Sequence, residues 1–140
     1  MIKKLLNLIP SQIVYAHCDV PCGIYDPKAS QVAAQTVLKM VQIIKGIDQS
    51  SKTLDDRNTL IRAIWTKEEH ARKCKEEILI LWTDYFKPEH LERFPDLHDK
   101  FWKATKQAGT CKKTVDPAEG QKLLDMIDDI ASVFAETKKA

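Results

Sequence analysis

The chain has 140 residues, of which 30% are charged and 44% hydrophobic, and a formal net charge of +2. This composition fits one soluble helical domain rather than a disordered chain, and four glycines and six prolines are too few for a turn-rich all-β fold. Because the net charge is small and both signs are interspersed, no nucleic-acid partner is predicted. No membrane partner is predicted either, since no apolar run approaches the roughly 18–20 residues that span a bilayer.

The first segment of the chain, Met1–Ala16, has the composition of a leader that is removed on maturation. Two lysines precede a short apolar stretch, Asn7 and Pro10 interrupt it, and the small residue Ala16 precedes the expected cut. We interpret residues 1–16 as a cytoplasmic pro-segment that a maturation protease removes. An export signal of a periplasmic protein and a retained amphipathic helix are the alternatives. The remaining residues, 17–140, are predicted to form a single domain.

Two helices are predicted in the first half of this domain. Apolar residues recur with helical spacing over 27–46, and Asp26-Pro27 is typical of an N-cap followed by the first helical position. A longer helix is predicted over 54–85, before a proline that ends it. Its charged stretch Lys67–Lys73 is expected to face water. Its buried face is expected to hold Ile61, Ile64, Ala71, Cys74, Ile78, Leu81 and Tyr85.

Two further helices complete the predicted fold. The third covers 89–108, is interrupted at Pro95 and stops at Gly109, and the fourth begins at Asp116-Pro117 and ends near 137. Four amphipathic helices with short connections predict an all-α fold, an antiparallel four-helix bundle. The two solitary thiols, Cys74 and Cys111, are interpreted as buried or half-exposed helix residues.

The run from His17 to Cys22 holds an imidazole and two thiols within six residues, before the first predicted helix. Thiolates are soft ligands, and two cysteines this close can bind one metal ion, with Pro21 and Gly23 shaping the turn. A local disulfide and two independent thiols are the alternatives. If the chain is cut after Ala16, His17 gains a free α-amine.

A free amine, the Cys18 backbone nitrogen and two sulfurs can lie in one plane, with the His17 ring as a fifth, axial ligand. Square-planar ligation favours nickel(II) or copper(II). Thiolate and deprotonated amide ligands also stabilise a higher oxidation state, so a Ni(III)/Ni(II) couple becomes accessible. The residues therefore predict a metal-binding hook over 17–25 that could serve a redox enzyme. A metal-binding protein without turnover and a structural bundle with a Cys18–Cys22 disulfide remain alternatives.

The run His17–Pro27 resembles the nickel hook of nickel superoxide dismutases, H-C-x-x-P-C-G-x-Y-D-P, and every fixed position of that motif is present. Leu81–Pro88 is similar to the family's W-x-D-Y-F-K-P segment, and Phe94–His98 is also similar. So are three pieces near the C-terminus, at 116–117, 120–122 and 136–140. The resemblance extends over essentially all of 17–140.

The resemblance implies that each chain binds one nickel ion and converts superoxide to dioxygen and hydrogen peroxide. His17 would supply its amine and axial imidazole, Cys18 its amide nitrogen and thiolate, and Cys22 the second thiolate. Asp19 and Tyr25 would lie around the metal, with Tyr25 at the mouth of the site. The family also implies a four-helix bundle assembled as a homohexamer, a pro-segment removed by a protease, and a supply of nickel.

Two positions depart from the family pattern. Some members hold the axial imidazole with a glutamate and an arginine, and the corresponding positions here are Ala33 and His70. His70 is therefore a candidate to orient the His17 ring, and a solvated histidine on a charged helix face is the alternative. Because superoxide is an anion, Lys28 is a candidate to attract it, and a solvated lysine at a helix start is the alternative.

Overall fold

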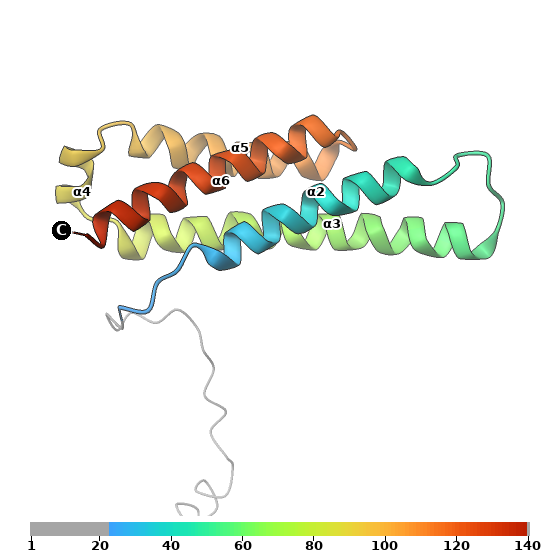
Figure 1. Ribbon diagram of the computed structural model, residues 1–140, viewed down its shortest axis with the longest axis horizontal. Coiled ribbons are helices and arrows are strands. Elements are labelled where there is room, and N and C mark those ends of the chain that lie inside the picture. Colours follow the sequence, from blue (N-terminus) through green and yellow to red (C-terminus); the bar gives the residue numbers. More distant parts are fainter. Residues whose placement is uncertain (1–22, 140) are drawn as a thin grey trace, which may run out of the picture.

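The computed structural model describes residues 23–139, which form an all-α bundle (Figure 1). Four long helices pack in a ring, with α2 against α3, α3 against α5, α5 against α6 and α6 against α2. This arrangement confirms the predicted antiparallel four-helix bundle. The elements are α2 (Lys28–Gly46), α3 (Leu54–Ile80), the π-helical turn η2 (Leu81–Tyr85), α4 (Pro88–Arg93), α5 (Leu97–Lys113) and α6 (Pro117–Thr137).

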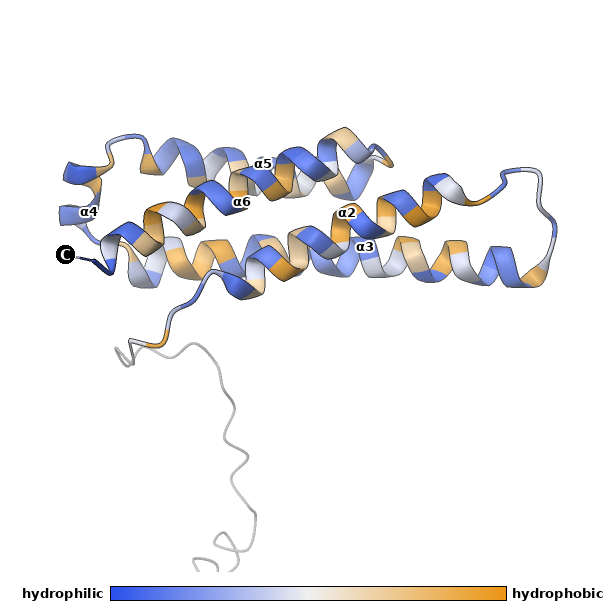
Figure 2. Cartoon of the chain, in the orientation of Figure 1, coloured by the Kyte–Doolittle hydropathy of each residue, from blue (hydrophilic) through white to orange (hydrophobic). Residues whose placement is uncertain are grey.

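The core lies between the four long helices, each of which shows alternating hydrophobic and hydrophilic bands (Figure 2). Its largest fully buried side chains include Phe101, Ile78, Leu97 and Leu123. Helix α6 approaches α2 closely at Gly120, where an added Cβ would lie 3.2 Å from the Leu38 Cα. Within residues 23–139, no helix is long and apolar enough to cross a membrane.

Helices α2 and α3 begin close to their predicted positions. Helix α2 starts one residue later than expected because Pro27 is its N-cap, while the Asp26 carboxylate accepts a hydrogen bond from the Lys28 N–H at 2.7 Å. The Thr53 hydroxyl caps α3 by accepting the Asp56 N–H at 3.1 Å. The predicted helix over 54–85 does not stay α-helical to its end, because its last turn is η2.

The predicted buried face of α3 is wrong in its first half. Ile61 and Ile64 are 67% and 40% exposed, and Ala63 and Lys67 are buried instead. In Figure 1 the α2–α3 hairpin extends beyond α5 and α6, so this part of α3 lacks the neighbours that surround the rest of the helix. Lys67, which was expected to face water, is 2% exposed. Its stem is covered and its ammonium group is hydrogen-bonded inside the bundle.

The third predicted helix is two helices, α4 and α5, and Pro95 lies between them as expected. The predicted stop at Gly109 is wrong, because α5 continues to Lys113. The extra turn buries Cys111, and the Lys67 ammonium group donates to the carbonyl oxygens of Cys111 and Lys112 at 2.7 and 2.6 Å. Burial and this charged cap together favour continuing the helix past a glycine.

Candidate metal centre

The predicted metal ligands His17, Cys18 and Cys22, together with Asp19, lie outside the described residues. The structure describes the chain from Gly23, the residue that follows the hook's second cysteine. Gly23 has φ +69°, in the left-handed region that favours glycine, and so allows the sharp change of direction expected at the end of the hook. No group of three or more His, Cys, Asp or Glu side chains within 23–139 could hold a metal ion.

Of the five residues predicted to bind or surround the metal, only Tyr25 has a side chain that the structure describes, and it packs against the bundle. The side chain is half-buried, and its ring lies 5.8 Å from the Tyr85 ring, centroid to centroid, at 54°. Tyr85 is the last residue of η2. Aromatic pairs at this separation are stabilised beyond the apolar area that they bury. The contact therefore fixes the chain three residues after the hook's second cysteine.

Tyr85 is itself held by several neighbours. Its ring packs on Phe134 of α6, with centroids 4.6 Å apart, and stacks with His90 of α4 at 5.6 Å and 17°. Its hydroxyl is 2.7 Å from the Thr137 hydroxyl. Because Thr137 donates its only hydroxyl proton to the Phe134 carbonyl oxygen at 2.6 Å, the Tyr85 hydroxyl is the donor to Thr137.

Sequence reasoning missed this role of Tyr85 and placed the residue on the buried face of a continuous helix. A π-helical turn contains more residues per turn than an α-helix, so it changes the direction in which Tyr85 points. Tyr85 is half-buried, whereas Phe86 beside it is in the core. The signal that could have found it is its place in the segment Leu81–Pro88, whose pattern follows the family.

The two departures from the family pattern have clear places in the structure. Ala33 is 1% exposed, on the core face of α2. His70 is half-buried on α3, with Nδ1 2.9 Å from the Thr66 carbonyl oxygen. A carbonyl oxygen can only accept, so Nδ1 carries a proton and Nε2 is the acceptor of the neutral ring. The role of His70 toward His17 stays a prediction.

The two remaining cysteines are not suited to ligate metal. Cys74 and Cys111 are both buried and free, as expected. Burial raises the pKa of the Cys74 thiol to about 12 and that of the Cys111 thiol to about 11. A metal binds the thiolate, and these groups are protonated at neutral pH. Neither thiol belongs to a group of side chains within 23–139 that could hold a metal ion.

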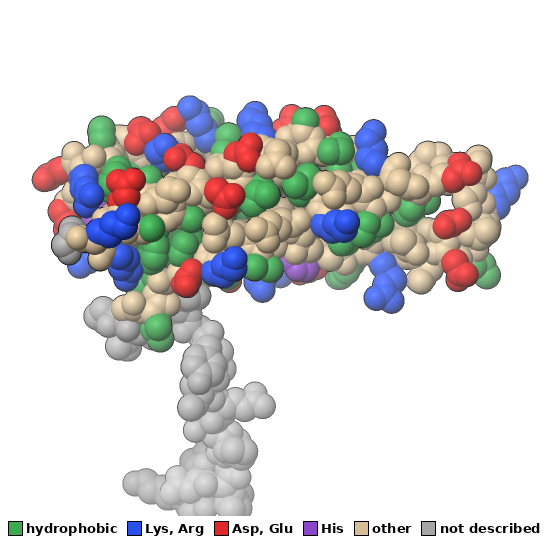
Figure 3. All heavy atoms as spheres, in the orientation of Figure 1, with side chains coloured by type: hydrophobic (Ala, Val, Ile, Leu, Met, Phe, Trp, Pro, Cys, Tyr) green, Lys and Arg blue, Asp and Glu red, His purple; other side chains and the backbone are tan. Residues whose placement is uncertain are grey.

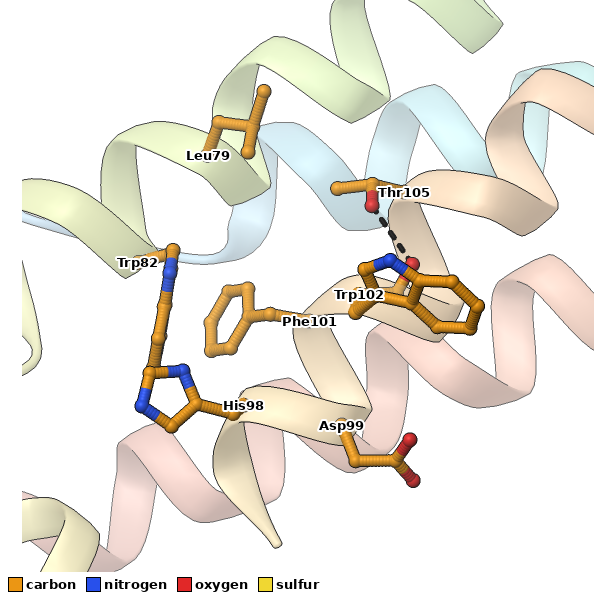
Figure 4. Close-up of a pocket in the computed structure, with 7 residues that line it drawn as sticks. All are labelled: Leu79, Trp82, His98, Asp99, Phe101, Trp102 and Thr105. Carbon is orange, nitrogen blue, oxygen red and sulfur yellow. Dashed lines mark hydrogen bonds between the residues drawn. The ribbon is translucent and has the colours of Figure 1, made fainter.

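A surface pocket of about 510 Å³ lies on the α3–α5 side of the bundle (Figure 4). Trp82 borders it and contacts the rings of His98 and Phe101 at 4.4 and 4.9 Å between centroids. The lining is mainly apolar, and none of the predicted site residues belongs to it. The lining residues are Leu79, Trp82, His98, Asp99, Phe101, Trp102 and Thr105.

The chain resembles proteins of known activity over most of its length. Residues 12–138 match the family model described as nickel-containing superoxide dismutase. The chain is 43% identical to superoxide dismutase [Ni] of Streptomyces seoulensis and 40% identical to that of Streptomyces coelicolor. Each alignment covers 94% of this chain and 95% of the relative. A native nickel superoxide dismutase structure matches with a TM-score of 0.78 at 40% identity, covering 89% of this chain and 100% of the solved chain.

Proposed function

The chain belongs to the nickel-containing superoxide dismutase family, and from that premise we propose that residues 17–25 form its metal centre. The protein is an oxidoreductase that acts on superoxide and uses nickel. The proposed ligands are the amine and imidazole of His17, the amide nitrogen and thiolate of Cys18, and the thiolate of Cys22. One observation carries this assignment: the hook motif is complete in a chain whose other two thiols are buried and protonated.

The proposed ligand set fits nickel chemically. The two thiolates and two backbone nitrogens would be strong ligands for nickel, and the His17 imidazole would supply one more nitrogen. When bound, the nickel ion would supply a one-electron couple between Ni(III) and Ni(II). The free amine of His17 exists only after cleavage, so removal of Met1–Ala16 is part of the proposal. The match with the native nickel superoxide dismutase structure supports this removal. It covers 100% of the solved chain but 89% of this chain, and the difference is about as long as Met1–Ala16.

The reaction needs anion access and protons rather than a deep substrate pocket. One superoxide gives up an electron and leaves as dioxygen, and a second takes up an electron and two protons and leaves as hydrogen peroxide. Tyr25 follows Cys22 by only three residues, so we assign its hydroxyl to positioning superoxide or water. Tyr85 holds the Tyr25 ring in place, and Asp19 is assigned to the surroundings of the ligands.

We also propose that the protein works as a cytoplasmic homohexamer, with export as the alternative. Large apolar side chains on the outer face of the bundle support subunit contacts, because covering them with a partner subunit lowers the free energy of the assembly. Trp65 and Ile61 of α3 are 68% and 67% exposed, and Trp102 of α5 is 60% exposed. Maturation would also need a protease for the leader and a source of nickel.

The metal content and electron paramagnetic resonance spectrum of protein processed to begin at His17 test the proposed centre. We expect one nickel ion per chain and a rhombic Ni(III) signal split by one nitrogen, which the His17 imidazole would supply. Superoxide decay, measured on the same sample, then separates an enzyme from a nickel-binding protein without turnover. Zinc, or a metal-free protein with a Cys18–Cys22 disulfide, would overturn the proposal.

A further inference from the structure

Lys138 places a positive charge on the aromatic cluster that holds Tyr25. Its ammonium nitrogen lies 4.9 Å from the centroid of the Tyr85 ring and 5.2 Å from that of Phe134. Both distances are within the range of attraction between a cation and the face of an aromatic ring. The Tyr85 ring also contacts the Tyr25 ring, so a single aromatic ring connects Lys138 to the residue that follows the hook.

The charge of Lys138 is exposed and is not used in an ion pair within residues 23–139. By contrast, Lys100 is neutralised by two carboxylates, Asp96 and Asp129. The stack on two rings limits where the Lys138 ammonium group can lie. An ammonium group held in this way keeps its positive charge at one exposed place, whereas that of a fully solvated lysine samples many positions.

Other charges share this end of the bundle, where α2 begins and α6 ends (Figure 1). The space-filling view shows Lys and Arg side chains gathered there, with carboxylates among them (Figure 3). Two carboxylates next in sequence to the paired tyrosines have hydrogen-bond donors of their own: Asp26 accepts from the Lys28 N–H, and Asp84 accepts from the Thr83 hydroxyl. Lys138 differs from the other cations because it stacks directly on Tyr85.

We propose that Lys138 is a steering residue for the superoxide anion, held on the Tyr85 and Phe134 rings and acting on the access route beside Tyr25. A cation near a reacting site raises the local concentration of an anionic substrate and its association rate. For one unit charge about 10 Å from the route in water, the expected gain in rate is about two-fold. The assignment rests on the proposed location of the metal centre.

The test compares processed, nickel-loaded Lys138→Gln with Lys45→Gln at low and high ionic strength. Lys45 is exposed in the last turn of α2, near the opposite end of the bundle, so both variants lose the same net charge. We expect Lys138→Gln to lower the second-order rate constant for superoxide about two-fold at about 0.01 M salt, and to match the wild type at about 1 M. Lys45→Gln should leave the rate unchanged at both.

Lys138→Arg separates charge from packing, because it keeps the cation and the ring stack. We expect it to retain the wild-type rate and its salt dependence. Equal salt dependence of Lys138→Gln and Lys45→Gln would overturn the steering role, as would a loss for Lys138→Gln that persists at high salt. Nickel content is measured on every sample. A wild-type protein without nickel would contradict the proposed centre, whereas a nickel-loaded, active Lys138→Gln with unchanged salt dependence contradicts only the steering role.

Discussion

The ring of Tyr25 rests against the ring of Tyr85, with centroids 5.8 Å apart, although 60 positions separate the two residues in the chain. This contact joins the segment that follows the hook to the end of η2. Tyr85 is in turn hydrogen-bonded to Thr137, near the end of α6. The position of Tyr25 therefore depends on two helix ends that the hook sequence does not contain.

The hydrogen bond between Tyr85 and Thr137 can be tested by a double-mutant cycle. Tyr85→Phe removes the donor and Thr137→Ala the acceptor, and we expect each to lower the free energy of unfolding by about 1 kcal/mol. The double variant should lose less than the sum of the two, because the single variants remove the same bond. Urea unfolding measures the stabilities. Additive losses would mean that the two hydroxyls do not interact.

Protein that keeps Met1–Ala16 is expected to be inactive in superoxide decay. The nitrogen of an uncut His17 belongs to a peptide bond, so it lacks the free amine proposed as a ligand. Cleavage of the same preparation to begin at His17 should restore nickel binding and activity together. Full activity of the uncut chain would contradict the ligand set, and mass spectrometry of the assayed sample excludes prior cleavage.

Cys22→Ser is expected to abolish both nickel binding and superoxide turnover, because a serine hydroxyl does not replace a thiolate as a soft ligand. The matched control is Cys74→Ala, which removes a buried thiol outside the hook. That variant should keep its nickel while losing some stability through the cavity it creates. Metal analysis of both proteins checks the prediction. A Cys22→Ser protein with nickel and normal turnover would rule out the hook.

Lys67→Met is expected to destabilise the fold by about 2–3 kcal/mol, because it removes hydrogen bonds from a buried cation to the end of α5. Besides the Cys111 and Lys112 carbonyl oxygens, Lys67 donates to that of Thr114 at 3.1 Å. The control is Lys73→Met, on an exposed position of the same helix, which should stay within about 0.5 kcal/mol of the wild type. Similar unfolding midpoints for both variants would contradict a capping role.

The thiols of Cys74 and Cys111 are expected to resist alkylation in the folded protein. Burial raises the pKa of Cys74 from 9.0 to about 12, so little thiolate exists at mildly alkaline pH. A variant with both hook cysteines changed to serine isolates these two thiols. Mass spectrometry should show slow labelling by iodoacetamide when folded and rapid labelling in urea. Equal rates in the two conditions would contradict their burial.

The same pKa shift has a consequence for stability. The folded state favours the neutral thiol, so Cys74 contributes stability below its unfolded pKa of 9.0, and this contribution is lost as pH rises toward about 12. We therefore expect the stability of the wild type to fall more steeply over this range than that of Cys74→Ala. Parallel curves would mean that Cys74 ionises equally easily in both states.

The sequence by itself determined the helical class and the bundle, and it predicts the ligand-bearing segment. Apolar residues at helical spacing define faces that must be buried, and the Asp116-Pro117 signal marked the start of α6 correctly. The hook motif is local, because the proposed nitrogen and sulfur ligands lie within six consecutive residues. Local chemistry of this kind can be inferred without knowing which distant residues come together.

Only the tertiary structure decided which residues surround Tyr25 and where α5 ends. Gly109 is a local signal for a helix stop, and it was overridden because Lys67, 44 residues from Cys111, caps a longer helix. The environment of Tyr85 likewise depends on a π-helical turn and on contacts with α4 and α6. Contacts between residues distant in sequence form only when the chain packs, so local spacing could not reveal them.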